Sequence, residues 1–200
     1  MNGSGSWVSP SADVSDQALI GDRVHIWDLT QVREQASIGR DTNIGRNVYI
    51  DHGVVVGNLC KIQNGAQLFS PARLGNGVFI GPGAILTNDV YPRAVEVSGK
   101  LKKASDWKPV GVIIEDGASV GAGAIAIGGI IVGRWAVVGA GATITKDVVP
   151  HALVVGTPAR QVGWVGTSGK RLVSTGDGIW LDETSHEEFV ERLDQIEARQ

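Results

Sequence analysis

The sequence lacks the features that are typical of disulfide-rich, membrane-spanning and nucleic-acid-binding proteins. Its one cysteine, Cys60, among 200 residues leaves no intramolecular disulfide framework and fits a reducing compartment, so we expect a cytoplasmic protein. No apolar run reaches the length of a membrane span, and the first residues, MNGSGSW, lack the charged and apolar regions of a signal peptide. A formal net charge of −3 does not give the basic footprint of a nucleic-acid-binding protein. We therefore expect one compact, soluble domain.

Aliphatic residues recur at every sixth position over the first part of the chain. A period of six fits neither a helix, with 3.6 residues per turn, nor one flat strand, with a period of two, so it indicates a repeat architecture. The fourteen positions are Val8, Val14, Ile20, Ile26, Val32, Ile38, Ile44, Ile50, Val56, Ile62, Leu68, Leu74, Ile80 and Leu86.

Each six-residue unit is predicted to form a short strand and a turn, and three units close one triangular coil of eighteen residues. The aliphatic side chains then point inward and stack on their equivalents one coil away, so Ile44, Ile62 and Ile80 are expected on one face of consecutive coils. The glycine that often follows the aliphatic, as Gly81 follows Ile80, is expected to allow a turn conformation that a side chain would penalise. The sequence thus predicts an all-β fold, a parallel β-helix that is stable only as a stack.

The repeat is interrupted once. The next aliphatic of the series follows Leu86 after twenty-eight residues, and twenty-eight is not a multiple of six. We therefore predict that a loop covering residues 87–111 is extruded between two coils. Long loops in compact domains are usually functional or disordered, and we expect chemistry at this one. The repeat resumes at Ile114, Val120, Ala126, Val132, Val138 and Ile144.

The C-terminal part differs in composition. We predict a β-helix domain over residues 1–164 and an extension over residues 165–200 that ends in a short amphipathic α-helix. Ser185 and Glu188 have the spacing of a capping box, and Phe189, Leu193 and Ile196 fall on one helical face. The expected role of the helix is to cover an open end or edge of the β-helix.

Histidines are few, and their spacing gives no sign of a metal. None of the four lies in the inserted loop, and His25 and His52 are one and a half coils apart, on different predicted faces. The sequence has no zinc-type Cys/His spacing, no phosphate-binding loop and no G-x-S-x-G elbow. We expect no metal cofactor.

The inserted loop begins with the polar run TNDVYPR, residues 87–93. Basic side chains at Arg93, Lys100, Lys102, Lys103 and Lys108 suit a diphosphate, which Arg and Lys commonly bind. The competing interpretation is an ordinary solvated loop.

The repeats and the loop together resemble a known family, the left-handed β-helix acyltransferases, over roughly Val8 to Arg160. Within that superfamily, HIWDLTQV, NIGRNVYI, KIQN, GPGAILTNDVYPRA and TKDVVPHALVVGTPARQVGW are similar to segments of the nucleotide-sugar 3-N-acetyltransferases, which act on UDP- or dTDP-linked 3-amino-sugars. The resemblance implies the left-handed coil, which the periodicity alone does not establish. The chain departs from many members at Asp28, where a histidine often stands.

The resemblance also implies a homotrimer, with acetyl-CoA lying in the groove between adjacent β-helices. It implies that Asn88 lies beside the acceptor amine. The substrate-binding residues that it implies are Arg93, Tyr91, His25, Gln63 and Asn64. The residues that it implies for coenzyme A are Ala122, Ala140, Gly141, Lys146 and Arg160.

An amine acceptor fits the residues better than an alcohol does, because the loop holds no histidine to act as a general base. A sugar amine titrates at about 8, like an α-amino group, so its neutral form is available at neutral pH and Asn88 need only orient it. We predict an acetyl-CoA-dependent N-acetyltransferase of a nucleotide-linked 3-amino-sugar. Two alternatives stay open: an acyltransferase of the same fold with another small acceptor, such as a hydroxyl or an amino acid, and a non-catalytic trimeric scaffold.

Overall fold

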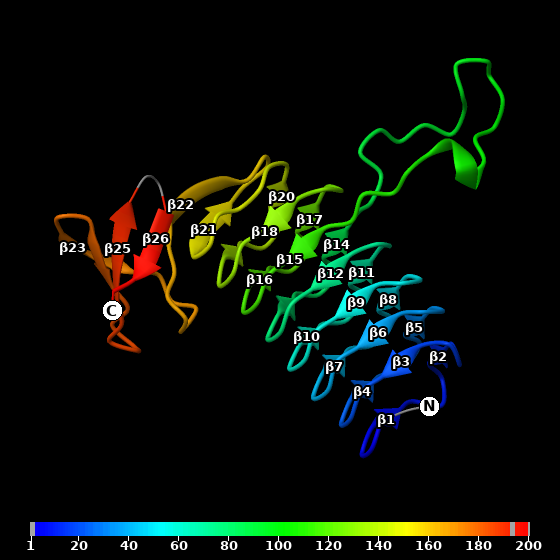
Figure 1. The fold of residues 1–200 in the computed structure, drawn as a ribbon, viewed down its shortest axis with the longest axis horizontal. Helices are drawn as coiled ribbons and strands as arrows, with labels where there is room; N and C mark the ends of the chain where they lie inside the picture. The colour runs from blue at the N-terminus through cyan, green and yellow to red at the C-terminus, as the bar shows by residue number, and fades with distance from the viewer. Residues whose placement is uncertain (1–2, 193–194, 200) are drawn as a thin grey trace.

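The computed structural model describes residues 3–192 and 195–199. Its two-residue strands wind into stacked coils, and equivalent strands of successive coils pair in parallel to form the three faces of a prism (Figure 1). We call the faces sheets I, II and III, in the order in which the chain visits them. The all-β coil predicted from the period of six is confirmed.

Each sheet takes every third strand of the coil, and at the C-terminal end sheet I gains two more strands, the last of which pairs antiparallel. Sheet I contains β1 (Trp7–Val8), β4 (His25–Ile26), β7 (Asn43–Ile44), β10 (Lys61–Ile62), β13 (Phe79–Ile80), β16 (Ser119–Val120), β19 (Val137–Val138), β21 (Ala152–Val155) and β22 (Arg160–Trp164). Sheet II contains β2 (Asp13–Val14), β5 (Gln31–Val32), β8 (Tyr49–Ile50), β11 (Gln67–Leu68), β14 (Ile85–Leu86), β17 (Ile125–Ala126) and β20 (Thr143–Ile144). Sheet III contains β3 (Leu19–Ile20), β6 (Ser37–Ile38), β9 (Val55–Val56), β12 (Arg73–Leu74), β15 (Ile113–Ile114) and β18 (Ile131–Val132).

The core is the column of aliphatic side chains that the period predicts. Ile62 pairs with Ile44 on one side and Ile80 on the other, and all three are fully buried. Burying such a side chain is worth about 1.5–3 kcal/mol, so the repeated column supplies most of the stabilisation of the stack.

The turns correct one expectation about glycine. The left-handed position of a turn lies three residues after the aliphatic, as at Asn47 (φ 57°) and Gly53 (φ 65°), and not at the glycine directly after it. Gly81, directly after Ile80, is required by close approach instead, because a Cβ there would lie 2.5 Å from the backbone nitrogen of Ala122 in the next coil.

The inserted loop leaves the prism after β14 and returns at β15, and it projects away from the coils (Figure 1). It holds one 3₁₀ turn, η1 (Ala104–Asp106), and a bridge between Val95 and Leu101. Several of its apolar side chains are exposed, Tyr91 at 83% and Leu101 at 75%. In the described part of the chain, no helix is long and apolar enough to cross a bilayer.

The predicted C-terminal helix is wrong. A four-stranded antiparallel sheet stands there, made of β23 (Val173–Gly176), β24 (Ile179–Leu181), β25 (Glu188–Arg192) and β26 (Gln195–Ala198). Phe189 and Ile196 are buried as expected, but on paired strands, and Phe189 lies against His151 of the β-helix with 5.0 Å between ring centroids. A helix this short is marginal by itself, so strand pairing and tertiary packing determine the structure. Leu193, also assigned to the helix, lies outside the described residues.

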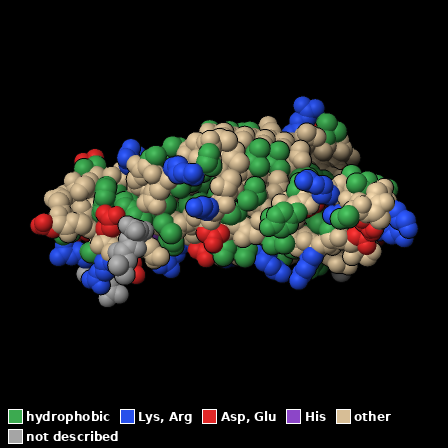
Figure 2. All heavy atoms as spheres, turned by 90° about the horizontal axis from the view of Figure 1, so that it is seen from above, with side chains coloured by type: hydrophobic (Ala, Val, Ile, Leu, Met, Phe, Trp, Pro, Cys, Tyr) green, Lys and Arg blue, Asp and Glu red, His purple; other side chains and the backbone are tan. Residues whose placement is uncertain are grey.

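Charged and apolar side chains are mixed on the surface. Figure 2 shows hydrophobic side chains exposed along the length of one face, interspersed with Lys and Arg. Exposed aromatic side chains of the coils include Trp7, which is 43% exposed, and Trp27, which is 44% exposed.

Candidate functional site

One corner of the prism carries a column of polar side chains. This is the corner between sheets II and III, from which the inserted loop leaves, and we call it the loop corner. Equivalent turn positions in four successive coils hold Glu34, His52, Ser70 and Asn88, at a constant spacing of eighteen residues. Coils stack about 4.8 Å apart, so each of these residues lies directly next to the one in the following coil.

Asn88, predicted to be catalytic, lies where the loop leaves the prism. Asn88 is hydrogen-bonded to Val110 near the end of the loop, and we call these two residues the neck of the loop. The side-chain Nδ2 of Asn88 donates a hydrogen bond to the Ser70 carbonyl at 2.5 Å, and the Asn88 carbonyl accepts one from the Val110 N–H at 2.9 Å. Gly128, in the next coil, packs against both residues of the neck: a Cβ there would lie 2.5 Å from the Val110 carbonyl oxygen and 3.1 Å from the Asn88 carbonyl carbon. The side-chain amide is thus held by the coil below, while the backbone of Asn88 packs against the coil above.

A pocket of about 450 Å³ opens beside this amide. Its walls are mainly apolar, and its polar groups come from the start of the loop. A pocket with a few convergent polar groups in an apolar wall is typical of a small-molecule site. The lining residues are Phe69, Thr87, Asn88, Asp89, Val90, Pro92 and Ile127.

Asp51 is the most heavily hydrogen-bonded carboxylate of the loop corner, and the sequence analysis missed it. Its Oδ1 accepts from Arg33 Nη1 (3.0 Å), the Tyr49 hydroxyl (3.0 Å), the His52 backbone N–H (2.8 Å) and His52 Nδ1 (3.0 Å), while its Oδ2 accepts from the Ser70 N–H (3.1 Å). Burial opposes ionisation, but the N–H groups of Ser70 and His52 and the side chains of His52 and Tyr49 hold the pKa of Asp51 below its ordinary value. Asp51 is therefore ionised at neutral pH.

His52 joins Asp51 to Ser70. A carboxylate only accepts, so Nδ1 carries the proton toward Asp51 and Nε2 faces the Ser70 hydroxyl at 3.4 Å. The imidazole is half-exposed, whereas Ser70 and Asp51 are buried. The eighteen-residue spacing from His52 to Ser70 to Asn88 is the sequence signal that could have identified this group.

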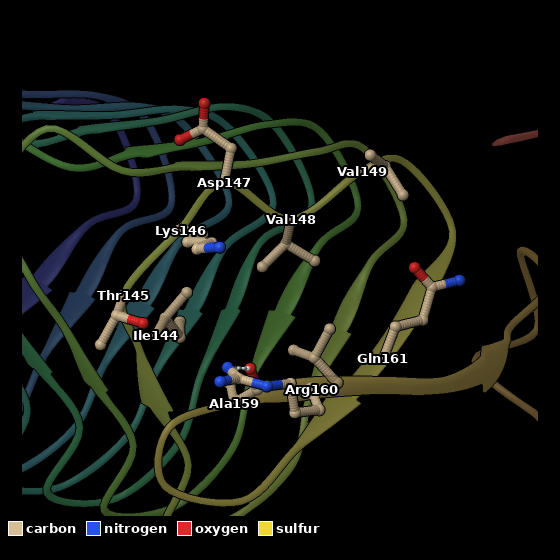
Figure 3. Close-up of a pocket in the computed structure, with 10 residues that line it drawn as sticks. Ile144, Thr145, Lys146, Asp147, Val148, Val149, Ala159, Arg160 and Gln161 are labelled. Carbon is tan, nitrogen blue, oxygen red and sulfur yellow. Dashed lines mark hydrogen bonds between the residues drawn. The ribbon is translucent and has the colours of Figure 1, made fainter. Parts of the chain in front are cut away.

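The upper end of the loop corner is cationic. Lys146 and Arg160, both predicted for coenzyme A, line one pocket of about 260 Å³ with Asp147. In Figure 3, the Lys146 and Arg160 side chains border the pocket while the Asp147 carboxylate points away from it. That carboxylate accepts a hydrogen bond from the Ile131 N–H at 2.8 Å, so the two cations are available to an anion.

The other predicted site residues are not gathered at the loop corner of one protomer. Most lie in turns at the corner between sheets I and II, which we call the I–II corner. His25 lies on the outer face of sheet I. The Asn64 side-chain oxygen accepts from the Arg46 N–H at 2.9 Å, and the His25 ring lies 6.5 Å from the ring of Trp7. The residues of the I–II corner turns are Gln63, Asn64, Ala122, Ala140 and Gly141.

Tyr91 and Arg93 lie in the projecting loop. Both are exposed, and the Arg93 guanidinium donates to the carbonyl of its neighbour Pro92 at 2.9 Å. Their roles toward substrate stay predictions, as do those of the I–II corner residues. A site that uses both corners requires a second copy of the chain.

Two stretches of the chain match models of six-residue repeats. Residues 35–69 match the bacterial transferase hexapeptide (six repeats), and residues 111–146 match the hexapeptide repeat of succinyl-transferase. The acetyltransferase domain of PglB from Neisseria gonorrhoeae superposes with a TM-score of 0.50 at 23% identity, over 78% of this chain and 57% of that one. The fold is the left-handed β-helix of hexapeptide-repeat acyltransferases. The first matched stretch lies in the coils before the inserted loop, and the second lies in the coils after it.

Two other proteins are similar to this chain over different lengths. A mutant of AntD, an N-acyltransferase from Bacillus cereus whose structure holds dTDP and coenzyme A, superposes with a TM-score of 0.50 at 19% identity, over 81% of this chain and 82% of that one. The serine acetyltransferase of Escherichia coli (strain K12) is 40% identical over 88 residues, which are 44% of this chain and 31% of that protein. The chain thus spans about a third of the length of that relative.

Proposed function

We propose that this protein is an acetyl-CoA-dependent N-acetyltransferase whose acceptor is the 3-amino group of a dTDP- or UDP-linked sugar. The observation that carries the proposal is the fixed amide of Asn88 at the mouth of the 450 Å³ pocket. With Nδ2 donating to the Ser70 carbonyl, Oδ1 is the atom left to accept a hydrogen bond from an amine. The amine lone pair is then directed at the thioester without a base.

In the proposed reaction, the neutral amine attacks the thioester carbonyl of acetyl-CoA. A C–N bond forms and the C–S bond breaks, so the products are the acetamido sugar and the coenzyme A thiolate. The proton that the nitrogen loses goes to that thiolate or to water. Because the two reactants are held in one site, Asn88 contributes by orientation, which is worth several powers of ten in rate when geometry is exact.

The proposed route of coenzyme A runs along the loop corner. The acetyl group lies by Asn88 and the phosphates near Lys146 and Arg160, which charge complementarity favours. Ala122, Ala140 and Gly141 are proposed to offer backbone groups from a neighbouring copy, because they belong to the I–II corner. The nucleotide diphosphate is proposed to meet Arg93 and the loop lysines. The bound dTDP and coenzyme A of AntD motivate this assignment.

A homotrimer is part of the proposal. The loop projects with its apolar side chains exposed, and the predicted cofactor residues are divided between two corners, so threefold packing would cover the loop and complete the site. Light scattering should give a mass near three times the 21.0 kDa of the chain. A mass near 21.0 kDa at micromolar protein would contradict both the trimer and the shared site.

The test of the activity is a panel of acceptors. The protein is incubated with acetyl-CoA and dTDP- or UDP-linked sugars that carry the amine at carbon 3 or carbon 4, and free thiol and acetylated sugar are measured together. Turnover of a 3-amino-sugar supports the proposal. Coenzyme A binding without turnover of any amine contradicts it, and the absence of coenzyme A binding favours the scaffold.

One observation favours a second candidate function, acetylation of a hydroxyl. The Asp51–His52 pair orients a half-exposed imidazole whose Nε2 faces the Ser70 hydroxyl, and an oriented imidazole is the general base that an alcohol acceptor needs. The serine acetyltransferase relative motivates the same idea. A His52→Ala variant separates the two functions: it should abolish transfer to a hydroxyl, whereas amine transfer guided by Asn88 should survive within about tenfold.

A further inference from the structure

Ser70 links a buried carboxylate to the Asn88 amide through its own backbone. The Ser70 N–H donates to Asp51 Oδ2 at 3.1 Å, and the Ser70 carbonyl accepts from Asn88 Nδ2 at 2.5 Å. Asp51 is 7% exposed and Ser70 is 5% exposed, so water competes little for the bond between them. The orientation of the Asn88 amide therefore depends on where the backbone of Ser70 lies, from its N–H to its carbonyl.

The two oxygens of Asp51 have separate partners. Among the described residues, Oδ1 accepts four hydrogen bonds, from Arg33, Tyr49 and His52, and Oδ2 accepts one, from the Ser70 N–H. Because of this division, replacing one oxygen of the carboxylate by an NH2 group is enough to disrupt the hydrogen bonds. An asparagine here would turn its oxygen toward the four donors and its NH2 toward the Ser70 N–H, which would set two donors against each other.

We infer that Asp51 is a positioning residue for acyl transfer, which acts on Asn88 through the backbone of Ser70. Asp51 Oδ2 holds the Ser70 N–H, and the carbonyl on the other side of the Ser70 Cα binds Nδ2 of Asn88. Oδ1 of Asn88 then faces the acceptor amine. If the Ser70 backbone shifts and its carbonyl moves, the Asn88 amide is free to rotate by half a turn and present its NH2, a donor, to the N–H groups of the acceptor. The inference rests on the proposed function and extends it to a residue two coils below Asn88.

The first arm of the test is a double-mutant cycle on the full chain, with the best amino-sugar found in the acceptor panel. Asp51→Asn should lower kcat by about 10- to 100-fold and change KM for acetyl-CoA by less than about twofold, since the loss is one of orientation. The double variant of Asp51→Asn and Asn88→Ala should be no slower than Asn88→Ala alone, because Asp51 acts only through Asn88.

Asp116→Asn is the matched control. Asp116 also accepts a backbone hydrogen bond from the neighbouring coil, from the Asn76 N–H at 2.6 Å, but at the corner between sheets III and I. The Asp116→Asn variant should leave kcat unchanged. A purely structural role for Asp51 would instead give losses that multiply in the double variant or that accompany a loss of coenzyme A binding.

A second variant covers the case in which Asp51→Asn does not fold. Asn88→Asp keeps the size and an acceptor oxygen but loses the N–H that binds the Ser70 carbonyl. Because Asn88 lies at the half-exposed neck of the loop, the variant should fold, and it should be as slow as Asn88→Ala. Wild-type activity in Asn88→Asp, or multiplied losses in the double-mutant cycle, would overturn the inference but not the proposed function. A wild-type protein that acetylates no amino-sugar would overturn the proposed function and the inference with it.

Discussion

Gly128→Ala tests whether the neck of the loop sets the geometry of the site. An alanine Cβ at this position lies 2.5 Å from the Val110 carbonyl oxygen and 3.1 Å from the Asn88 carbonyl carbon. Ordinary contacts begin near 3.4 Å, so the neck must move by most of an ångström or the coil must open. Overpacking of this kind costs about 1–3 kcal/mol of stability, and a displacement of that size at a reacting centre lowers kcat by about 10²-fold.

The assay is thermal melting together with steady-state kinetics, and Gly133→Ala is the control. Its Cβ meets the Pro150 backbone nitrogen at 2.5 Å, so it crowds the backbone to the same degree, away from the neck. Both variants should lose similar stability, but only Gly128→Ala should lose turnover. Equal losses of turnover in the two variants would refute the reasoning, because the effect would then follow from stability alone.

Two further predictions concern stability. Ile62→Asp introduces an unpaired charge at a fully buried position between Ile44 and Ile80, so the free energy of unfolding should fall by several kcal/mol, and unchanged melting would show that the register is wrong. The lowered pKa of Asp51 means that its stabilisation is complete above its unfolded pKa, about 3.9, and is lost as the pH falls through the folded pKa. The difference in melting temperature between wild type and Asp51→Asn should therefore shrink below about pH 4, and a difference that is constant with pH would contradict the ionised carboxylate.

The coils could be predicted because a fixed period reports the register directly. Once Ile44, Ile62 and Ile80 are placed eighteen residues apart, the pairing of β7, β10 and β13 follows. The C-terminal segment offered no such repetition. Phe189 and Ile196 are compatible with one face of a helix and equally with two paired strands, and packing against His151 determines which forms.

Residues of the candidate site could be predicted where they stand in a motif, and not where their arrangement depends on hydrogen bonds. Asn88, Lys146 and Arg160 stand in conspicuous segments, and the structure puts them along or above one corner. Asp51 and His52 belong to the same corner, but neither stands in a motif that predicts a catalytic role. The register alone would have placed His52 below Ser70, although it could not have shown which oxygen of Asp51 binds which donor.

The measurement that tests the central claim most directly is turnover of the preferred 3-amino-sugar nucleotide by Asn88→Ala, beside His25→Ala and His52→Ala. The account predicts that Asn88→Ala lowers kcat by about 10² or more while coenzyme A still binds, and that both histidine variants remain active from about pH 6 to about pH 9. Nearly wild-type turnover by Asn88→Ala, with activity abolished in a histidine variant over that range, would contradict it. A general base would then be required, and the acceptor would be a hydroxyl.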